Sequence, residues 1–372
     1  MRFPDDVPVL GDGIVTLRAH SADDLARIVE QCNDPESIAW TTVPVPYGES
    51  DARDWVGEKI PQGWEAGATQ CFAIEHEGRF AGSVDLRSRG HRGAEVGFGL
   101  HPEARGKGVM KRAVNLLLDW GFRQQEYAVV TWRANAGNWA SRRVVWAAGF
   151  HFGETIPGLL EQRGERYDGW TGWITADDAR EPQHPWIDVP VLETTRLRIR
   201  PWRVDDGVRL VEASNDERLR RFIPASPVPR DLADVPAYLT RVQLGAANGS
   251  RIAWCIADRA TDQALGNVAL FDVEGSDDAR TAQVGFWGHP DSRGRGIMTE
   301  AVRRVVDWCV EAAPHGFGVR RLVLFAAVGN TASRRVAEQA GFVHVGTERA
   351  AAPIGDGDFD DNAIYDRLRD DS

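Results

Sequence analysis

The sequence has few cysteines and no long hydrophobic segment. Four of its 372 residues are cysteine (Cys32, Cys71, Cys255 and Cys309), and they have neither metal-ligand spacing nor a shared place in the two halves of the chain. This excludes a disulfide framework and a cysteine-built metal site, and it indicates reduced thiols. No apolar run approaches a membrane span, and the N-terminal residues do not follow a signal-peptide pattern. We therefore expect a cytoplasmic protein without a metal or a membrane partner.

Lysine is also scarce, and positive charge is in deficit. Lys59, Lys107 and Lys111 are the only lysines, a bias that we attribute to genomic base composition. The net charge is −11, which argues against a nucleic-acid partner. An acidic protein attracts cationic small substrates over long distances, but the same charge also serves solubility alone. The net charge therefore argues against nucleic acid as a partner and does not identify a substrate.

What the chain does have is an internal repeat. The segment Arg105-Gly106-Lys107-Gly108-Val109-Met110 recurs as Arg293-Gly294-Arg295-Gly296-Ile297-Met298. Each copy follows the same lead-in, Val-Gly-Phe-x-x-His-Pro, and each is followed by an amphipathic stretch that contains Asp-Trp. A repeat of such a long period indicates duplicated domains rather than a solenoid.

The repeat extends over most of the chain. It runs from Leu17-Arg18 to Gly149-Phe150 in the first copy and from Ile199-Arg200 to Gly341-Phe342 in the second. We predict a first domain over residues 1–178, a linker over 179–189 and a second domain over 190–372. The linker is polar, contains two prolines and matches neither copy. Each predicted domain is long enough to bury its own core.

The glycine-rich turn is predicted to bind phosphate. Buried strands are expected over residues 95–100 and 283–288, and apolar residues at helical spacing follow each turn. The glycines then lie at a helix N-terminus, where free backbone N–H groups and the helix dipole bind a diphosphate. Arg105, Lys107, Arg293 and Arg295 add positive charge. A single Arg-Gly-x-Gly is often only a solvated turn, but its repetition between a strand and a helix favours phosphate binding. The glycine spacing matches neither the Rossmann nor the Walker motif.

With these residues in view, the chain resembles the GNAT superfamily of N-acyltransferases, whose signature is Arg/Gln-x-x-Gly-x-Gly/Ala. Asn-x-x-Ser followed by Ala-Gly-Phe is similar to the RimJ/RimL-like branch. The resemblance implies an α/β (α+β) protein built as a tandem duplication of the GNAT fold, each copy a mixed central β-sheet flanked by helices. One departure occurs in both copies, where Met110 and Met298 stand at the last signature position in place of Gly or Ala.

The resemblance also implies acetyl-CoA as the cosubstrate. Its pyrophosphate would be held by Arg105, Gly106, Lys107 and Gly108 in the first copy and by Arg293, Gly294, Arg295 and Gly296 in the second. Its pantetheine arm would pair with the preceding strand, near Phe98 to Leu100 and near Phe286 to Gly288.

Two Asn–Ser pairs are candidate site residues. By the resemblance, Ser141 and Ser333 lie near the CoA sulfur and donate a proton to the leaving thiolate, and Asn138 and Asn330 contact the pantetheine or the substrate. GNAT enzymes transfer the acyl group directly, in agreement with the lack of a convincing nucleophile and base arrangement here. The alternative for each pair is helix capping, since Asn three residues before Ser is a helix start signal, and Asn can do both.

Glu95 is the candidate general base of the first copy. Its counterpart in the second copy is Gln283, and a carboxylate can deprotonate an ammonium through water whereas an amide cannot. The alternative is an acid at a strand edge in solvent; we favour the base. Glu300 occurs only in the second copy, so neither copy is plainly inactive.

Tryptophan is unevenly distributed between the copies. Trp139, Trp146, Trp170 and Trp173 have no tryptophan counterpart in the second copy. They either line an aromatic or cation-binding acceptor site or, as we favour, belong to the core or a domain interface.

We therefore predict an acetyl-CoA-dependent N-acyltransferase that transfers an acyl group directly to a primary amine of a small molecule or to a peptide N-terminus. One alternative is an aminoglycoside-type antibiotic N-acetyltransferase. Another, of a different class, is a non-catalytic acyl-CoA sensor or scaffold, against which Glu95 and both serines argue. One copy could perform the chemistry while the other supports it. The oligomeric state stays open, with a homodimer as one option.

Overall fold

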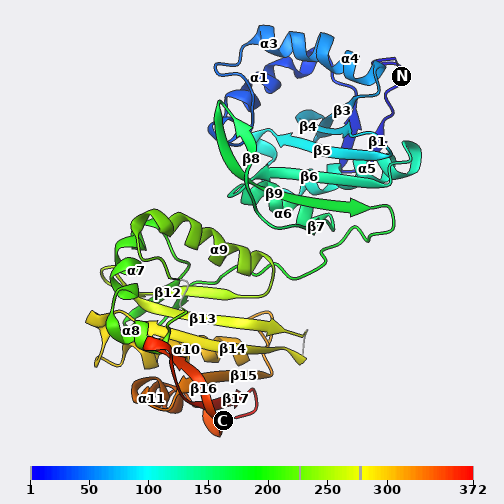
Figure 1. Ribbon diagram of the computed structural model, residues 1–372. Helices are drawn as coiled ribbons and strands as arrows, with labels where there is room; N and C mark the ends of the chain where they lie inside the picture. The colour runs from blue at the N-terminus through cyan, green and yellow to red at the C-terminus, as the bar shows by residue number, and fades with distance from the viewer. Residues whose placement is uncertain (1, 226–227, 276–278, 372) are drawn as a thin grey trace. The chain divides into compact units, whose positions relative to one another are not determined.

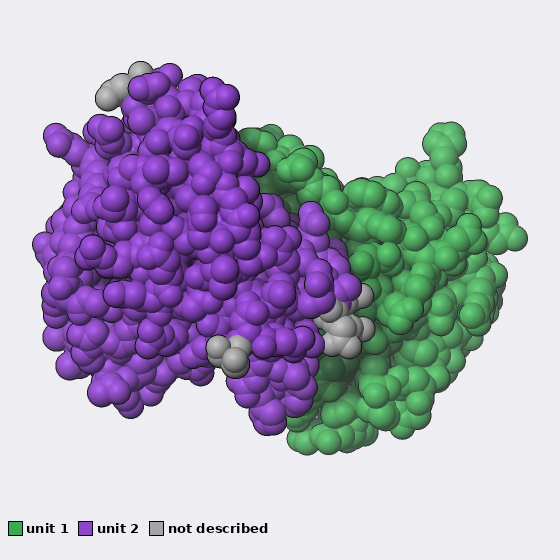
Figure 2. Space-filling view, turned by 90° about the horizontal axis from the view of Figure 1, so that it is seen from below, with its two compact units in different colours: residues 1–183 green, residues 184–372 purple. Residues whose placement is uncertain are grey.

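The computed structural model describes residues 2–225, 228–275 and 279–371, and the chain divides into two compact units. Unit 1 comprises residues 1–183 and unit 2 comprises residues 184–372, and Figure 2 shows them in different colours. Ile187, inside the predicted linker 179–189, is buried in the core of unit 2. Among the described residues, no helix is long and apolar enough to cross a membrane.

Unit 1 is organised around one mixed β-sheet (Figure 1). Over the described residues its strand order is β1-β2-β3-β4-β5-β6-β9-β7, with β8 paired to β9. Neighbouring strands are antiparallel except β5 and β6, which are parallel. The strands are β1 (Leu10–Gly11), β2 (Val15–Arg18), β3 (Thr69–His76), β4 (Arg79–Ser88), β5 (Gly93–Leu100), β6 (Val129–Asn135), β7 (His151–Phe152), β8 (Ile156–Gln162) and β9 (Glu165–Thr175).

Helices flank this sheet. The longest, α5, follows the glycine-rich turn and buries an apolar stripe at helical spacing. A π-helical turn at Trp55–Lys59 joins α3 to α4. The helices are α1 (Leu25–Asn33), α2 (Pro35–Trp40), α3 (Glu49–Asp54), α4 (Ile60–Glu65), α5 (Val109–Gln124) and α6 (Trp139–Ala147).

Unit 2 repeats this arrangement. Its described strands lie in the order β10-β11-β12-β13-β14-β15-β17-β16, and β14 and β15 form the parallel pair. The strands are β10 (Leu192–Glu193), β11 (Leu197–Arg200), β12 (Ile252–Asp258), β13 (Ala264–Glu274), β14 (Thr281–Gly288), β15 (Arg321–Ala327), β16 (Val343–Ile354) and β17 (Asp358–Leu368). The helices are α7 (Gly207–Ser214), α8 (Glu217–Phe222), α9 (Val235–Ala247), α10 (Ile297–Val310) and α11 (Thr331–Gln339). The prediction of mixed sheets flanked by helices is confirmed in both units.

The sheet of unit 2 has a core on each face. Side chains alternate along a strand, so one strand can serve both faces. On β12, Trp254 belongs to the core formed with α10, whereas Cys255 belongs to the core formed with α7 and α9. Both faces of β12 therefore carry apolar side chains. A continuous apolar run of this kind is typical of a strand that is covered on both sides.

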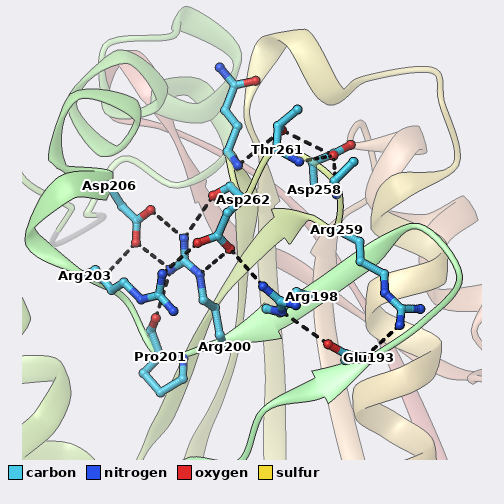
Figure 3. Close-up of polar contacts among 12 residues, drawn as sticks. Glu193, Arg198, Arg200, Pro201, Arg203, Asp206, Asp258, Arg259, Thr261 and Asp262 are labelled. Atoms are coloured by element: carbon cyan, nitrogen blue, oxygen red, sulfur yellow. Dashed lines mark hydrogen bonds and ion pairs between the residues drawn. The ribbon is translucent and has the colours of Figure 1, made fainter.

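The Ile199-Arg200…Asp205-Asp206 motif anchors the start of unit 2. Arg200, at the end of β11, donates from its two terminal nitrogens to Asp206 at 2.8 and 2.9 Å and from Nε to Asp262 at 3.0 Å (Figure 3). Only 3% of the Arg200 side chain is exposed. The hydrogen bonds from Arg200 and Arg203 lower the pKa of Asp262, against the opposing effect of burial. The ion pair thus ties a strand end to the loop before α7 and to the β12–β13 turn.

Unit 1 holds the same anchor with one different acid. Arg18 donates to both oxygens of Asp24 at 2.8 Å and to Glu75 at 2.7 Å. Burial raises the pKa of Asp24, but hydrogen bonds from Arg18 and Ser21 more than offset it, and the pKa is lowered. The Arg–Asp pairs at these repeated positions therefore have a structural role.

Next to this anchor the units differ in a titratable residue. His20 is buried, its Nε2 lies 2.9 Å from Ser83 Oγ, and its ring packs edge-on against Trp55. Burial lowers the pKa of His20 to about 3. The corresponding residue of unit 2 is Trp202, whose Nε1 donates to Asn267 at 3.0 Å.

Unit 1 should lose stability in mild acid because of His20. The unfolded imidazole takes up a proton below its ordinary pKa of 6.5, whereas the buried ring stays neutral until about pH 3. Its contribution is therefore complete above pH 6.5 and is lost as the pH falls from there towards 3. The free energy of unfolding should fall by about 1.4 kcal/mol per pH unit in this window, or about 2 kcal/mol at about pH 5.

Urea unfolding at a series of pH values measures this loss, with His20→Gln as the comparison. The variant removes the titrating ring, so the difference in unfolding free energy between wild type and variant should shrink as the pH falls. A difference that stays constant from neutral pH to about pH 4 would show that His20 does not control the acid sensitivity.

Candidate functional site

In each unit the sheet splits at its parallel strand pair. Within the described residues, β5 pairs with β6 only through Gly93, Ala94 and Glu95, although β5 continues to Leu100. Unit 2 repeats this, with β14 and β15 paired only over residues 281–283. Beyond these residues the edge of β5 or β14 can hydrogen-bond an extended ligand, as an exposed sheet edge does in strand addition.

The glycine turns leave a helix N-terminus open beside each split. Gly106 and Gly108 have φ of +73°, and Gly294 and Gly296 have +70° and +72°, which is the region where glycine is favoured. Gly108 and Gly296 are the N-cap residues of α5 and α10, and no side chain caps either helix. The first N–H groups of both helices are therefore free to bind an anion.

The space around these turns is open as well. A Cβ placed on Gly106, Gly108 or Gly294 would meet no atom within 4 Å. The backbone conformation, and not crowding by the protein, therefore requires glycine here. The turns fit a diphosphate, since they combine free N–H groups, room and positive charge.

The two arginines that begin the turns form ion pairs that the sequence did not indicate. Arg105 donates to Asp34 at 2.5 Å and to Glu36 at 2.8 Å, and Arg293 is paired with Asp216. Asp34 and Asp216 are the N-caps of α2 and α8. Arg105 and Arg293 thus fasten the turn to a neighbouring helix, and their predicted role in holding the pyrophosphate stays a prediction.

Lys107 and Arg295 are the other basic side chains of the turns. Both are exposed at the apex of their turns. Arg295 donates to the carbonyl of Asp291 at 3.5 Å. The Met110 and Met298 positions face the sheet below the turn, since Met110 is buried and the Met298 Cε lies 3.0 Å from the place of a Cβ on Gly266.

A cavity of about 410 Å³ follows the split of unit 1. It brings together most of the predicted site residues of this unit, while Gly106, Lys107 and Gly108 lie outside its lining. The predicted residues that line it are Glu95, Phe98, Leu100, Arg105, Asn138 and Ser141.

Two adjoining cavities of unit 2, of about 380 and 440 Å³, follow its split. Phe286, Asn330 and Ser333 line both. The first cavity contains the turn, with Gly288, Arg293, Gly294 and Gly296 in its wall and Arg295 outside it. The second lies on the other side of the split and includes Gln283. None of the described residues that line the three cavities is a cysteine or a histidine.

The asparagines cap the helices that follow the second core strands. Asn138 Oδ1 accepts from the Ser141 N–H at 3.1 Å, and Asn330 Oδ1 accepts from the Ser333 N–H at 3.3 Å. The capping interpretation therefore holds for both, and each Nδ2 remains available for a ligand. A role in binding CoA stays a prediction.

Ser141 has a partner that the sequence did not indicate. The Trp132 Nε1 donates to Ser141 Oγ at 3.0 Å, which leaves the serine proton for another acceptor. The register of the strands places Leu324 at the corresponding position of unit 2. In the sequence, the signal for this contact is a tryptophan on the second core strand of the first copy, where the second copy has none. The sequence did not show that Trp132 reaches Ser141, because the contact depends on the packing of β6 against α6.

Glu95 lies at the last paired position of β5 and is buried. Its Oε2 accepts from Arg89 at 3.0 Å and from Arg133 at 2.8 Å, and it lines the cavity. The alternative of a solvated strand-edge acid does not hold, because the carboxylate is buried in an ion-pair cluster. The role of general base stays a prediction.

The tryptophans singled out in the sequence do not line the cavity. Trp170 is buried against Trp139, with ring centroids 4.6 Å apart, and Trp173 stacks on His151. The tryptophans that do line it are Trp40 and Trp132. The core interpretation therefore fits Trp170, and the acceptor-site interpretation fails for these residues.

The described residues contain no cluster of histidine, cysteine, aspartate or glutamate side chains that could hold a metal ion. Burial raises the pKa of the thiols of Cys32, Cys71, Cys255 and Cys309.

The fold and the paired turns define an acyltransferase of the GNAT type. The family model described as "Acetyltransferase (GNAT) domain" matches residues 15–151 and again residues 196–343. The chain therefore belongs to the GNAT acetyltransferase family, with one domain of the family in each unit. The predicted tandem arrangement of two GNAT acetyltransferase domains is confirmed.

Individual relatives are more distant. The Probable N-acetyltransferase YjcK of Bacillus subtilis is 36% identical over 104 residues, which cover 28% of this chain and 54% of that protein. The ribosomal-protein-serine acetyltransferase of Escherichia coli is 27% identical over 109 residues, 29% of this chain and 57% of that protein. The chain thus spans little more than half the length of these relatives. Among solved structures, RimJ of Mycobacterium smegmatis in complex with CoA-disulfide matches 48% of the chain and 91% of its own, at 23% identity and a TM-score of 0.41.

Proposed function

We propose that the chain is an acetyl-CoA-dependent N-acyltransferase that transfers an acyl group directly to a primary amine of a small molecule or to a peptide N-terminus. One observation carries the proposal: in both units an uncapped helix N-terminus after a Gly-x-Gly turn lies beside a split pair of parallel strands. The first feature suits a diphosphate and the second suits an extended amide chain, which are the two parts of CoA that a protein must hold.

Different groups of each unit hold the different parts of CoA. The N–H groups of the turns and of the first helical residues hold the pyrophosphate, with Lys107 or Arg295 as an added cation. The open edges of β5 and β14 pair with the pantetheine amides. Acetyl-CoA, when bound, supplies an acyl group activated as a thioester.

Acid–base catalysis in unit 1 is assigned to two residues that line the same cavity. Ser141 keeps its proton for the departing sulfur, because Trp132 donates to its oxygen and holds the hydroxyl in place. Glu95 Oε1 is the oxygen that the two arginine contacts leave for a water, through which the incoming ammonium can lose its proton. The lack of cysteine and histidine in the described cavity walls supports direct transfer without a covalent intermediate.

The name of one relative bears on the acceptor class. The name of the Escherichia coli relative refers to a serine of a ribosomal protein, which supports a protein or peptide as the acceptor. No feature of the cavities favours an aminoglycoside over other amines.

A screen of amines against the full chain tests the proposal. Release of the CoA thiol from acetyl-CoA should depend on the amine supplied, among peptides that begin with serine or alanine, amino acids, polyamines and aminoglycosides. The double variant Gly108→Trp/Gly296→Trp should release none, because both turns are blocked. Acetyl-CoA binding without turnover on any amine would identify a sensor instead, and turnover confined to aminoglycosides would identify a resistance enzyme.

A further inference from the structure

The two units carry different side chains on the same wall of the split. The wall positions are equivalent by strand register, and they line a cavity beside the split in each unit. In unit 1 the three residues are ionised, and in unit 2 two are aromatic and one is an amide. They are Arg87, Glu95 and Arg133 in unit 1 and Phe271, Gln283 and Phe325 in unit 2.

The register makes this correspondence secure. Arg87 pairs with Glu95 across β4 and β5, as Phe271 pairs with Gln283 across β13 and β14. Glu95 and Gln283 are each the last residue of the parallel pairing. Side chains directly opposite on neighbouring strands share one face of the sheet. The change from charge to aromatic rings therefore affects the same surface.

Further aromatic residues complete the wall in unit 2. Trp287 stands where unit 1 has Gly99, and it stacks on Trp202 with ring centroids 5.8 Å apart. Phe286 and Leu324 also line this cavity of about 440 Å³. Such a cavity suits a ligand with an apolar body of about the size of an aromatic ring.

One cation lies in this apolar wall. The guanidinium carbon of Arg251 is 4.4 Å from the centroid of the Phe271 ring, and Arg251 lines the cavity together with Tyr238. Among the described residues the buried Nε of Arg251 has no hydrogen-bond partner, and the side chains that act on its charge are Tyr238 and Arg241, neither of which is a carboxylate. Burial lowers the pKa of Arg251. A desolvated guanidinium without an acid is unfavourable unless an anion binds to it.

We propose that this second cavity of unit 2 binds an amine that has an apolar, aromatic-sized body and an anionic group, with the anion against Arg251. The inference rests on the proposed function and names the class of small molecule that the cavity of unit 2 binds; it concerns binding and not transfer by unit 2. Phe271, Phe325 and Trp287 hold the apolar body, and the guanidinium selects molecules that also carry a carboxylate or a similar anion. Unit 1 does not bind such a body, because its ionised wall would lose water without gaining apolar contacts.

Binding of two small molecules to the full chain tests this without any transfer. 3-Phenylpropanoate has the ring and the anion but no amine, and 2-phenylethylamine has the ring and the amine but no anion. Titration followed by tryptophan fluorescence should show saturable binding of both, since Trp287 lines the cavity. Arg251→Met should weaken 3-phenylpropanoate about tenfold or more, because a charged hydrogen bond is lost, and should change 2-phenylethylamine by less than about twofold.

Two further variants test which cavity binds the two molecules. Phe325→Arg, which copies Arg133 of unit 1, should remove binding of both molecules. Arg87→Met, the matched loss of a guanidinium in unit 1, should leave both unchanged. Equal weakening of both molecules by Arg251→Met, or weakening of 3-phenylpropanoate by Arg87→Met instead, would overturn the inference.

The same protein is titrated with CoA. Failure of both small molecules to bind while CoA still binds would overturn this inference and leave the proposed function standing. Loss of CoA binding would overturn the proposed function itself.

Discussion

Ser141→Ala should lower kcat about a hundredfold or more and leave the affinity for CoA unchanged. The serine proton is needed when the thiolate departs, so its loss raises the energy of the transition state and not that of the bound complex. Unit 1 is the better candidate for this chemistry because Trp132 holds the Ser141 hydroxyl and Glu95 lines the same cavity. The measurement is steady-state turnover on one good acceptor from the amine screen, with the CoA affinity determined separately.

Ser333→Ala is the matched control. Ser333 occupies the same helix position in unit 2, but Leu324 replaces the tryptophan and Gln283 replaces the glutamate. Turnover of Ser333→Ala on the same acceptor should stay near that of the wild type. If Ser333→Ala is the impaired variant, unit 2 performs the chemistry and unit 1 supports it.

Glu95→Gln should lower kcat/KM for the acceptor about a hundredfold at low pH and much less at high pH. At low pH the acceptor is an ammonium and needs a base, whereas at high pH the free amine is already present. The pH dependence of kcat/KM measures this. An unchanged profile would mean that Glu95 has no part in proton removal.

Glu95 also holds Arg133 and Arg89, so its loss could act through them. Arg133→Met separates the two roles, because it removes an ion-pair partner and keeps the carboxylate. A general base predicts that only Glu95→Gln changes the shape of the pH profile. The same change of shape in Arg133→Met would assign Glu95 to positioning Arg133.

The turns could be predicted because their signals are local. A Gly-x-Gly between an apolar strand and an apolar helix fixes both the backbone conformation and the open N–H groups within a few residues. The same holds for the Asn138 and Asn330 caps, which act on residues three positions away. The equivalence of Glu95 and Gln283 followed from the repeat alone, and the strand register agrees with it.

The contacts that decide the roles of side chains are not local. Arg105 meets Asp34 across 71 residues, so nothing near the turn showed that this arginine fastens α2. The difference between Arg133 and Phe325 becomes meaningful only when the strand pairing places each of them in the wall of a cavity beside the split. The tryptophans did not identify the cavity for the same reason, because their spacing in the sequence does not show which of them faces the split.

Calorimetric titration of the full chain with CoA tests the central claim that each unit is a CoA-binding GNAT domain. The wild type should give two sites per chain. Gly108→Trp and Gly296→Trp should each leave one, because a large side chain at a φ of about +73° or +72° distorts the turn and fills the space over the helix N-terminus. One site in the wild type, abolished by only one of the two variants, would contradict the account.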